Sequence, residues 1–63
     1  MSKRELEVLT WIAAGKTAVD VGEILAISDR TVEWHIKTAM RKLGACNRVQ
    51  TVVLALRNGL IAP

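Results

Sequence analysis

The fold of this chain is decided by residues 28–43, which read SDRTVEWHIKTAMRKL. At about 100° per residue, a helix places the aliphatic residues of this stretch on one narrow face, made of Val32, Ile36, Ala39 and Leu43. The charged residues and one indole gather on roughly the opposite face, made of Arg30, Glu33, Trp34, Lys37 and Arg41. The pattern therefore predicts a helix with one side for a core and the other side for a partner.

Both ends of this helix are marked in the sequence. Ser28 occupies the position of an N-cap, and Gly44 follows the last apolar position, where a left-handed residue commonly ends a helix. A helix that opens with hydroxyls and an arginine, and exposes cations, a carboxylate and an indole, suits the major groove of DNA. Binding of duplex DNA is therefore the hypothesis that the remaining sequence must support.

Length and composition indicate one small helical domain. The chain has 63 residues, of which 51% are hydrophobic, and it contains no Phe or Tyr. Its net charge of +3 is compatible with a polyanionic partner, although many small domains are equally basic. A single cysteine, Cys46, excludes an internal disulfide and a cysteine-based zinc site. Since neither a membrane-span pattern nor a secretory pattern is present, we expect a cytoplasmic, nucleoid-associated protein without a membrane role.

Three further helices are predicted from capping signals. The pairs with the spacing of a capping box are Ser2 with Glu5, Thr17 with Asp20, and Asn47 with Gln50. Together with the stretch above, they predict helices at about 2–14, 17–25, 28–43 and 47–58. The predicted fold is an all-α four-helix bundle that fills the chain as one domain.

The connection between the second and third predicted helices is very short. It contains only Ala26, Ile27 and Ser28, and a short turn between a short and a longer helix is the helix-turn-helix layout. In that layout the second of the two helices enters the DNA groove. Gly22, inside the first of them, costs about 1 kcal/mol relative to Ala. Its presence is explained if another helix passes too close for a side chain, the alternative being a tolerated, neutral glycine.

Apolar spacing predicts which residues form the core. The residues expected to face inward are Val21, Ile24 and Leu25 in the second helix, and Val49, Val52, Val53 and Leu56 in the fourth, with Leu60 and Ile61 folding back. The first helix has apolar residues on more than one side, so we expect neighbours on two sides. We interpret Trp11 as a cover over a seam between helices, and His35 as a hydrogen-bonded structural residue.

A second surface is predicted on the fourth helix. The patch consists of Gln50, Val53, Leu54 and Arg57. We interpret it as a self-complementary dimer contact, because a domain this small seldom holds enough DNA alone. The alternative is an isolated exposed leucine at position 54, which needs no explanation. Dimers would bind a pseudo-palindrome whose half-sites lie about one helical turn apart.

Over nearly its whole length the chain resembles the LuxR-type helix-turn-helix domain. The motifs that carry the resemblance are KRELEVL at 3–9, Trp11, GKT at 15–17, ILAISDRTV at 24–32, His35, KLGA at 42–45, NR at 47–48 and GLI at 59–61. Trp11, the GKT motif and RNGLI at 57–61 look most like the acyl-homoserine-lactone quorum-sensing branch, with response regulators second. The resemblance implies the C-terminal, DNA-binding part of a longer transcriptional regulator. A small-molecule signal would act only through a sensor domain outside this sequence, and RNA polymerase is a candidate partner.

The sequence departs from the family pattern at a few positions. The family usually has Glu, Ile and Ala where this chain has Asp20, Val21 and Gly22, and often Asn in place of Thr38. The first three changes are conservative in shape, so the fold expectation stands. The resemblance also implies base contacts from Glu33 and Trp34, at positions that vary among members and set the preferred DNA sequence.

Two classes of DNA contact are expected. Phosphate contacts are assigned to Lys16 and Thr17, to Arg30 and Thr31 with the backbone N–H groups beside them, and to Arg41 at the groove edge. Arg41 could equally be a solubilising surface residue.

The base contacts are assigned to Glu33, Trp34 and Lys37. Lys37 can reach guanine O6 and N7 or a phosphate, and Glu33 can accept from a cytosine amine. Glu33 could instead pair with Lys37 on its own helix. Trp34 could contact a thymine methyl or deoxyribose, or pack on the corner of the helix-turn-helix.

No enzyme chemistry is indicated. The chain has one His, no phosphate-binding glycine loop and no base placed beside Cys46, so we expect no catalytic, cofactor or metal site. The rival function is a helical protein-interaction module with no DNA role.

Overall fold

The computed structural model describes residues 1–63 as four helices without a strand. The helices are α1 (Lys3–Ala13), α2 (Ala18–Leu25), α3 (Asp29–Leu43) and α4 (Arg48–Arg57). Every bound lies within one residue of its expected position, and the starts differ because the N-cap residues lie outside the helices. The all-α helix-turn-helix prediction is thereby confirmed. None of the four helices combines the length and the apolar composition that crossing a membrane would require.

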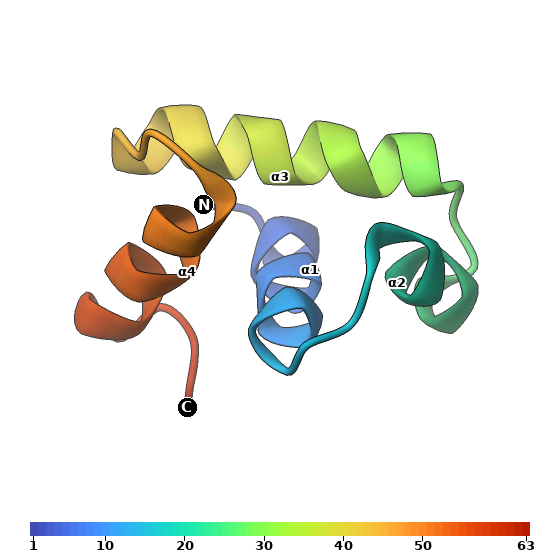
Figure 1. Ribbon diagram of the computed structural model, residues 1–63, viewed down its shortest axis with the longest axis horizontal. Helices are drawn as coiled ribbons and strands as arrows, with labels where there is room; N and C mark the ends of the chain where they lie inside the picture. The colour runs from blue at the N-terminus through green and yellow to red at the C-terminus, as the bar shows by residue number, and fades with distance from the viewer.

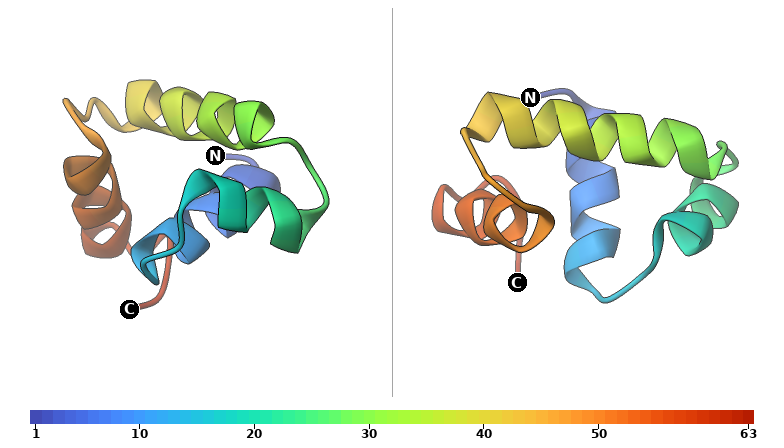
Figure 2. Two further views of the ribbon diagram at one scale, coloured as in Figure 1. Left: turned by 45° about the vertical axis from the view of Figure 1, so that its right-hand side comes forward. Right: turned by 45° about the horizontal axis from the view of Figure 1, so that its top comes forward.

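The longest helix, α3, organises the molecule. It contacts α1, α2 and α4, whereas α2 and α4 do not contact each other. Figure 1 shows α3 along the top, with α2 below one end, α4 below the other and α1 between them. The two views of Figure 2 keep this arrangement. All three neighbours therefore cover the same side of α3 and leave its other side open.

The core consists of two clusters. The first cluster joins α1, α2 and α3 through Val8, Val21, Val32 and Ile36. The second joins α1, α3, α4 and the C-terminal segment through Leu9, Ala39, Ala55 and Ile61. Because the adjacent residues Val8 and Leu9 enter different clusters, α1 has neighbours on two sides, as expected. Trp11 is half-buried against the first cluster, in agreement with a covering role.

All four helices begin at the predicted caps. The boxes at Ser2 and Thr17 are complete, with reciprocal hydrogen bonds to Glu5 and Asp20. Asn47 caps α4 by accepting from the N–H of Gln50 at 2.8 Å, but the Gln50 side chain accepts from the N–H of Cys46 rather than of Asn47. The predicted box at α4 is therefore only half formed.

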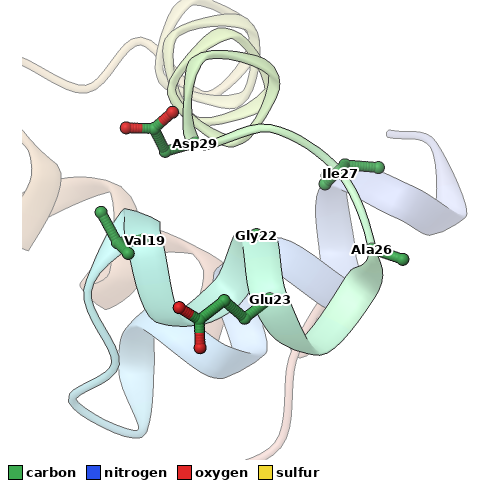
Figure 3. A pocket seen from close by; sticks show the side chains of 6 residues that line it. All are labelled: Val19, Gly22, Glu23, Ala26, Ile27 and Asp29. Atoms are coloured by element: carbon green, nitrogen blue, oxygen red, sulfur yellow. The ribbon is translucent and has the colours of Figure 1, made fainter.

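The turn between α2 and α3 explains the glycine in α2. A Cβ atom on Gly22 would lie 2.7 Å from the carbonyl oxygen of Ile27, too close for any side chain. Figure 3 shows Ile27 and Ala26 on the turn that leaves this part of α2. The expected close approach is therefore confirmed, but the nearest atom belongs to the turn, and α3 contributes only the backbone nitrogen of its first residue, Asp29, at 3.3 Å. Ala26 adopts a left-handed conformation with φ of 59°, which the sequence does not indicate.

Some of the residues predicted to face inward on α2 and α4 are exposed. Ile24 is 45% exposed, and in α4 Val49 and Val53 are 73% and 41% exposed. The buried residues of α4 are Thr51 and Ala55. The Thr51 hydroxyl donates to the carbonyl oxygen of Asn47 at 2.7 Å, so it is buried with a partner. Because α2 and α4 each contact only α1 and α3, part of each helix keeps its apolar side chains in solvent.

Candidate nucleic-acid interface

The outward face of α3 is open to solvent. Trp34 is 61% exposed, and Lys37 is also exposed. Val32, Ile36 and Ala39 on the opposite side of the helix are buried. The helix therefore has the two distinct sides that its sequence predicts. Of the proposed base-contacting residues, Trp34 and Lys37 are exposed and Glu33 is half-buried.

The cations of this face are free of carboxylate partners. The ion pairs of the molecule join Arg4 to Glu7, Lys42 to Glu5, and Arg48 to Glu33. Arg30, Lys37 and Arg41 are exposed and take part in none of them. Their positive charges are thus available to an anionic partner.

Glu33 is held by a neighbouring helix. Its Oε1 atom accepts a hydrogen bond from Nη2 of Arg48 at 2.5 Å, which joins α3 to α4. The alternative pairing with Lys37 on the same helix is not present. No sequence signal identifies Arg48, because a contact between residues 15 positions apart appears neither in helix periodicity nor in capping spacing.

Trp34 lies on the surface rather than in the corner of the helix-turn-helix. Its ring meets the His35 ring edge-on, with centroids 5.2 Å apart and an interplanar angle of 67°. The hydroxyl of Thr38 donates to the Trp34 carbonyl oxygen at 2.9 Å. His35 is half-buried, as expected for a structural residue. Its Nδ1 atom is buried without a hydrogen-bond partner, so the structure does not show the expected hydrogen bond at this nitrogen.

The starts of α2 and α3 carry the remaining phosphate-contact candidates. Lys16, Thr17 and Arg30 are exposed, and Thr31 is half-buried. Two backbone N–H groups of α3 are already paired, Arg30 with the Asp29 side chain and Thr31 with the Ser28 hydroxyl, both at 3.0 Å. Phosphate contacts at this end would therefore depend on side chains rather than on these two N–H groups.

Carboxylates also gather near this end. The backbone N–H of Thr17 donates to Oδ2 of Asp20 at 3.1 Å, and hydrogen bonding with Thr17 lowers the pKa of that carboxyl below its usual range. Figure 3 shows an open depression beside the turn with the carboxylates of Glu23 and Asp29 on its sides and Val19 at one end. Since its charge has the same sign as phosphate, this depression does not suit a DNA backbone.

The patch predicted on α4 is only partly exposed as expected. Gln50, Val53 and Arg57 are exposed, but Leu54 is half-buried. Val49, expected inside, is the most exposed large apolar residue of the molecule, at 73%. The apolar surface of α4 is therefore centred on Val49 and Val53, one helical turn apart.

No group of three or more His, Cys, Asp or Glu side chains in the structure could hold a metal ion.

Comparisons with known proteins agree with this architecture. The family model described as bacterial regulatory proteins, luxR family, matches residues 1–55. The transcriptional activator protein BjaR1 of Bradyrhizobium diazoefficiens is 51% identical over 63 residues, which are 100% of this chain and 26% of BjaR1. The HTH-type quorum sensing-dependent transcriptional regulator RpaR of Rhodopseudomonas palustris is 49% identical over 61 residues, 97% of this chain and 25% of RpaR. The chain thus spans about a quarter of the length of these curated relatives.

A solved structure extends the match to three dimensions. The structure of the transcription factor GerE is similar with a TM-score of 0.95 and 31% sequence identity, covering 98% of this chain and 92% of that chain. The sequence resemblance to quorum-sensing regulators is confirmed by the similarity to RpaR. The chain is therefore a helix-turn-helix DNA-binding domain that belongs to the luxR family of bacterial regulatory proteins.

Proposed function

We propose that this domain recognises duplex DNA by placing the outward face of α3 in the major groove, as the output part of a longer transcriptional regulator. The observation that carries the proposal is the exposed Trp34 and Lys37 on a helix whose other side is buried. An α-helix fits the width of the major groove, where each base pair presents a distinct set of donors and acceptors. BjaR1 and RpaR are named as transcriptional regulators, which supports the same role for this chain.

The residues divide into two roles. Lys37 reads guanine, Glu33 accepts from a cytosine amine, and Trp34 lies against a thymine methyl or a deoxyribose. The phosphate contacts come from Lys16, Thr17, Arg30, Thr31 and Arg41. Phosphate contacts supply most of the affinity and carry no sequence information, whereas base contacts set the preferred site.

The domain acts as a pair on a pseudo-palindromic site. The contact between copies is formed by α4 through Gln50, Val53 and Arg57, with Val49 at its centre and Leu54 at its edge. Exposed valines one turn apart on an outer helix support this assignment, since burying them is favourable and a two-fold contact repeats the same patch.

The wider setting follows from the same family membership. The domain works in the bacterial cytoplasm at the nucleoid, with no catalytic role. Its signal arrives through a sensor domain outside this sequence, and RNA polymerase is a partner of the DNA-bound regulator. BjaR1 is named as an activator, which supports contact with the polymerase.

The experiment begins with a selection of bound sequences from random duplexes, followed by fluorescence anisotropy on the preferred site. We expect affinity to fall steeply with salt, by a log–log slope of about −0.9 for each phosphate neutralised. Lys37→Ala should weaken binding and relax the preference at one base pair. Lys16→Ala should weaken binding to all duplexes alike and reduce the salt slope by about one.

Two outcomes would contradict this function. Equal losses on preferred and random DNA for both variants would refute the division of roles. Failure to bind any duplex at low salt would favour the rival function, a helical protein-interaction module, whose binding through apolar contacts would depend little on salt.

A further inference from the structure

Arg48 links α4 to the face of α3 that reads DNA. Its Nη2 atom donates to Oε1 of Glu33, and both side chains keep about two-fifths of their surface exposed, at 42% and 43%. We propose that Arg48 is a positioning residue for base readout, which fixes the Glu33 carboxylate in the orientation that meets a base edge. This inference rests on the proposed function, because Glu33 reads a base only if α3 enters the major groove.

The charge of Glu33 makes such a partner favourable. Glu33 is half-buried at the edge of the open face of α3 that borders α4, beside Trp34 and one turn before Lys37. A carboxylate carried into the groove approaches two rows of phosphates, and like charges repel at that range. The Arg48 guanidinium, which is always protonated, offsets part of this charge before DNA arrives.

The geometry leaves Glu33 able to accept a second hydrogen bond. Arg48 occupies Oε1, and Oε2 makes no hydrogen bond within the protein. A cytosine amine can therefore donate to Oε2 while the ion pair persists. The guanidinium also keeps N–H groups that are not used by Glu33 and can donate to a phosphate.

Fixing the side chain in advance favours binding. A glutamate loses rotamer freedom when it is held against a base, which opposes association. In this domain part of that freedom is already lost in the free protein, because Glu33 is bonded to a different helix. Arg48 therefore contributes to the choice of base without touching that base.

The test measures dissociation constants for the domain on its preferred duplex and on duplexes with single base-pair substitutions. We expect Glu33→Ala to lose roughly tenfold discrimination at one base pair, the size of one good base contact. Arg48→Ala should lose the discrimination at the same base pair, and the double variant should match Glu33→Ala. Arg48→Lys, which keeps the charge with a different donor geometry, should retain part of the discrimination.

Arg41→Ala is the matched control. It removes the same charge from an exposed arginine on α3 that has no carboxylate partner. Arg41→Ala should weaken binding to all duplexes alike, without changing the preference at any base pair. Melting temperatures of the variants should stay close to that of the parent domain, because an exposed ion pair contributes little to stability.

The possible failures are distinguishable. If the parent domain binds no duplex, the proposed function is wrong and the role of Arg48 is lost with it. If Glu33→Ala leaves base preference unchanged while Lys37→Ala relaxes it, the DNA function stands and the positioning role is wrong. A uniform loss on all duplexes in Arg48→Ala and in Arg48→Lys, like that of Arg41→Ala, would make Arg48 a phosphate contact only.

Discussion

Glu5 is the buried carboxylate of this domain, at 3% exposure, and its pKa lies below its usual range. Burial alone would raise the pKa of Glu5. Hydrogen bonds from Lys42 Nζ at 2.8 Å and from the backbone N–H of Ser2 at 3.0 Å oppose this effect. Together they lower the pKa from 4.5 to about 2. The residue thus both caps α1 and joins it to the end of α3.

This depressed pKa makes folding sensitive to acid. Because the pKa of Glu5 is lower in the folded state than in the unfolded chain, the ionised carboxylate stabilises the fold. The stabilisation is complete above about pH 5 and is lost as the pH falls towards about 2. We expect the free energy of unfolding to fall by roughly 3 kcal/mol across this range through Glu5 alone.

Urea denaturation followed by circular dichroism at a series of pH values measures this loss. Glu5→Gln should be less stable than the parent at neutral pH and should lack this part of the acid sensitivity. Glu7→Gln, at an exposed ion pair with Arg4, is the control and should keep the parental pH dependence. An unchanged acid dependence in Glu5→Gln would show that the Lys42 contact does not stabilise the charged form.

At the scale of the helices, capping explains why the bounds could be predicted. Each of Ser2, Thr17, Ser28 and Asn47 accepts from an N–H three residues later, a bond that depends only on neighbouring residues. The open and buried sides of α3 could also be predicted, because Val32, Ile36 and Ala39 recur at helical spacing. The burial of Thr38, whose hydroxyl donates to the Trp34 carbonyl oxygen, could not.

The rotation of α4 could not be predicted in the same way. Its valines suggest a buried stripe, but Thr51 is buried in place of Val49 and Val53, with its hydroxyl bonded to the preceding turn. Helical periodicity could not identify the partners of Glu5 and Glu33 either, since Lys42 and Arg48 lie 37 and 15 residues away in the sequence. Sequence periodicity identified the open face of α3, but not the arginine that orients its carboxylate.

The turn between α2 and α3 contains a residue under backbone strain. Ala26 has φ of 59°, and its N–H donates to the carbonyl oxygen of Gly22 as the C-cap of α2. A left-handed conformation costs an L-residue about 1–2 kcal/mol, whereas glycine adopts it readily. Replacing Ala26 by glycine would remove this cost, but part of the gain in stability is offset because glycine also has more freedom in the unfolded chain.

We therefore expect Ala26→Gly to raise the free energy of unfolding by about 0.5–1 kcal/mol. Urea denaturation at neutral pH measures the change. Ala13→Gly, at the exposed last residue of α1, should instead lower the stability. A loss of stability in Ala26→Gly would mean that the turn does not hold this residue in the left-handed conformation.

At the scale of the whole molecule, α2 and α4 flank opposite ends of α3 and do not touch. The side chains proposed to contact bases and phosphates come mainly from α3 and from the segment that enters α2, and Arg48, the first residue of α4, positions Glu33. The valines proposed for pairing lie on α4. Because separate helices carry the two surfaces, a second copy can pair through α4 while both copies present α3 to DNA.

If two copies pair through α4, they should bind neighbouring half-sites cooperatively, and a charge introduced on α4 should abolish this cooperativity. Val49→Asp and Val53→Asp place carboxylates where two copies would bury valine, and both positions are exposed, so each domain should still fold. We expect the variants to bind one half-site like the parent, but to lose its preference for two. A contact worth about 1.4 kcal/mol would make that preference tenfold.

Comparing dissociation constants on probes with one and two half-sites isolates the contact between copies from the contact with DNA. Ile24→Asp, at an exposed apolar residue on α2, is the control and should keep the parental ratio of the dissociation constants on the two probes. Leu54 is a poorer test, because it is half-buried and a charge there would also disturb folding. Unchanged ratios for both valine variants would exclude α4 as the pairing surface and leave α3 to bind each half-site independently.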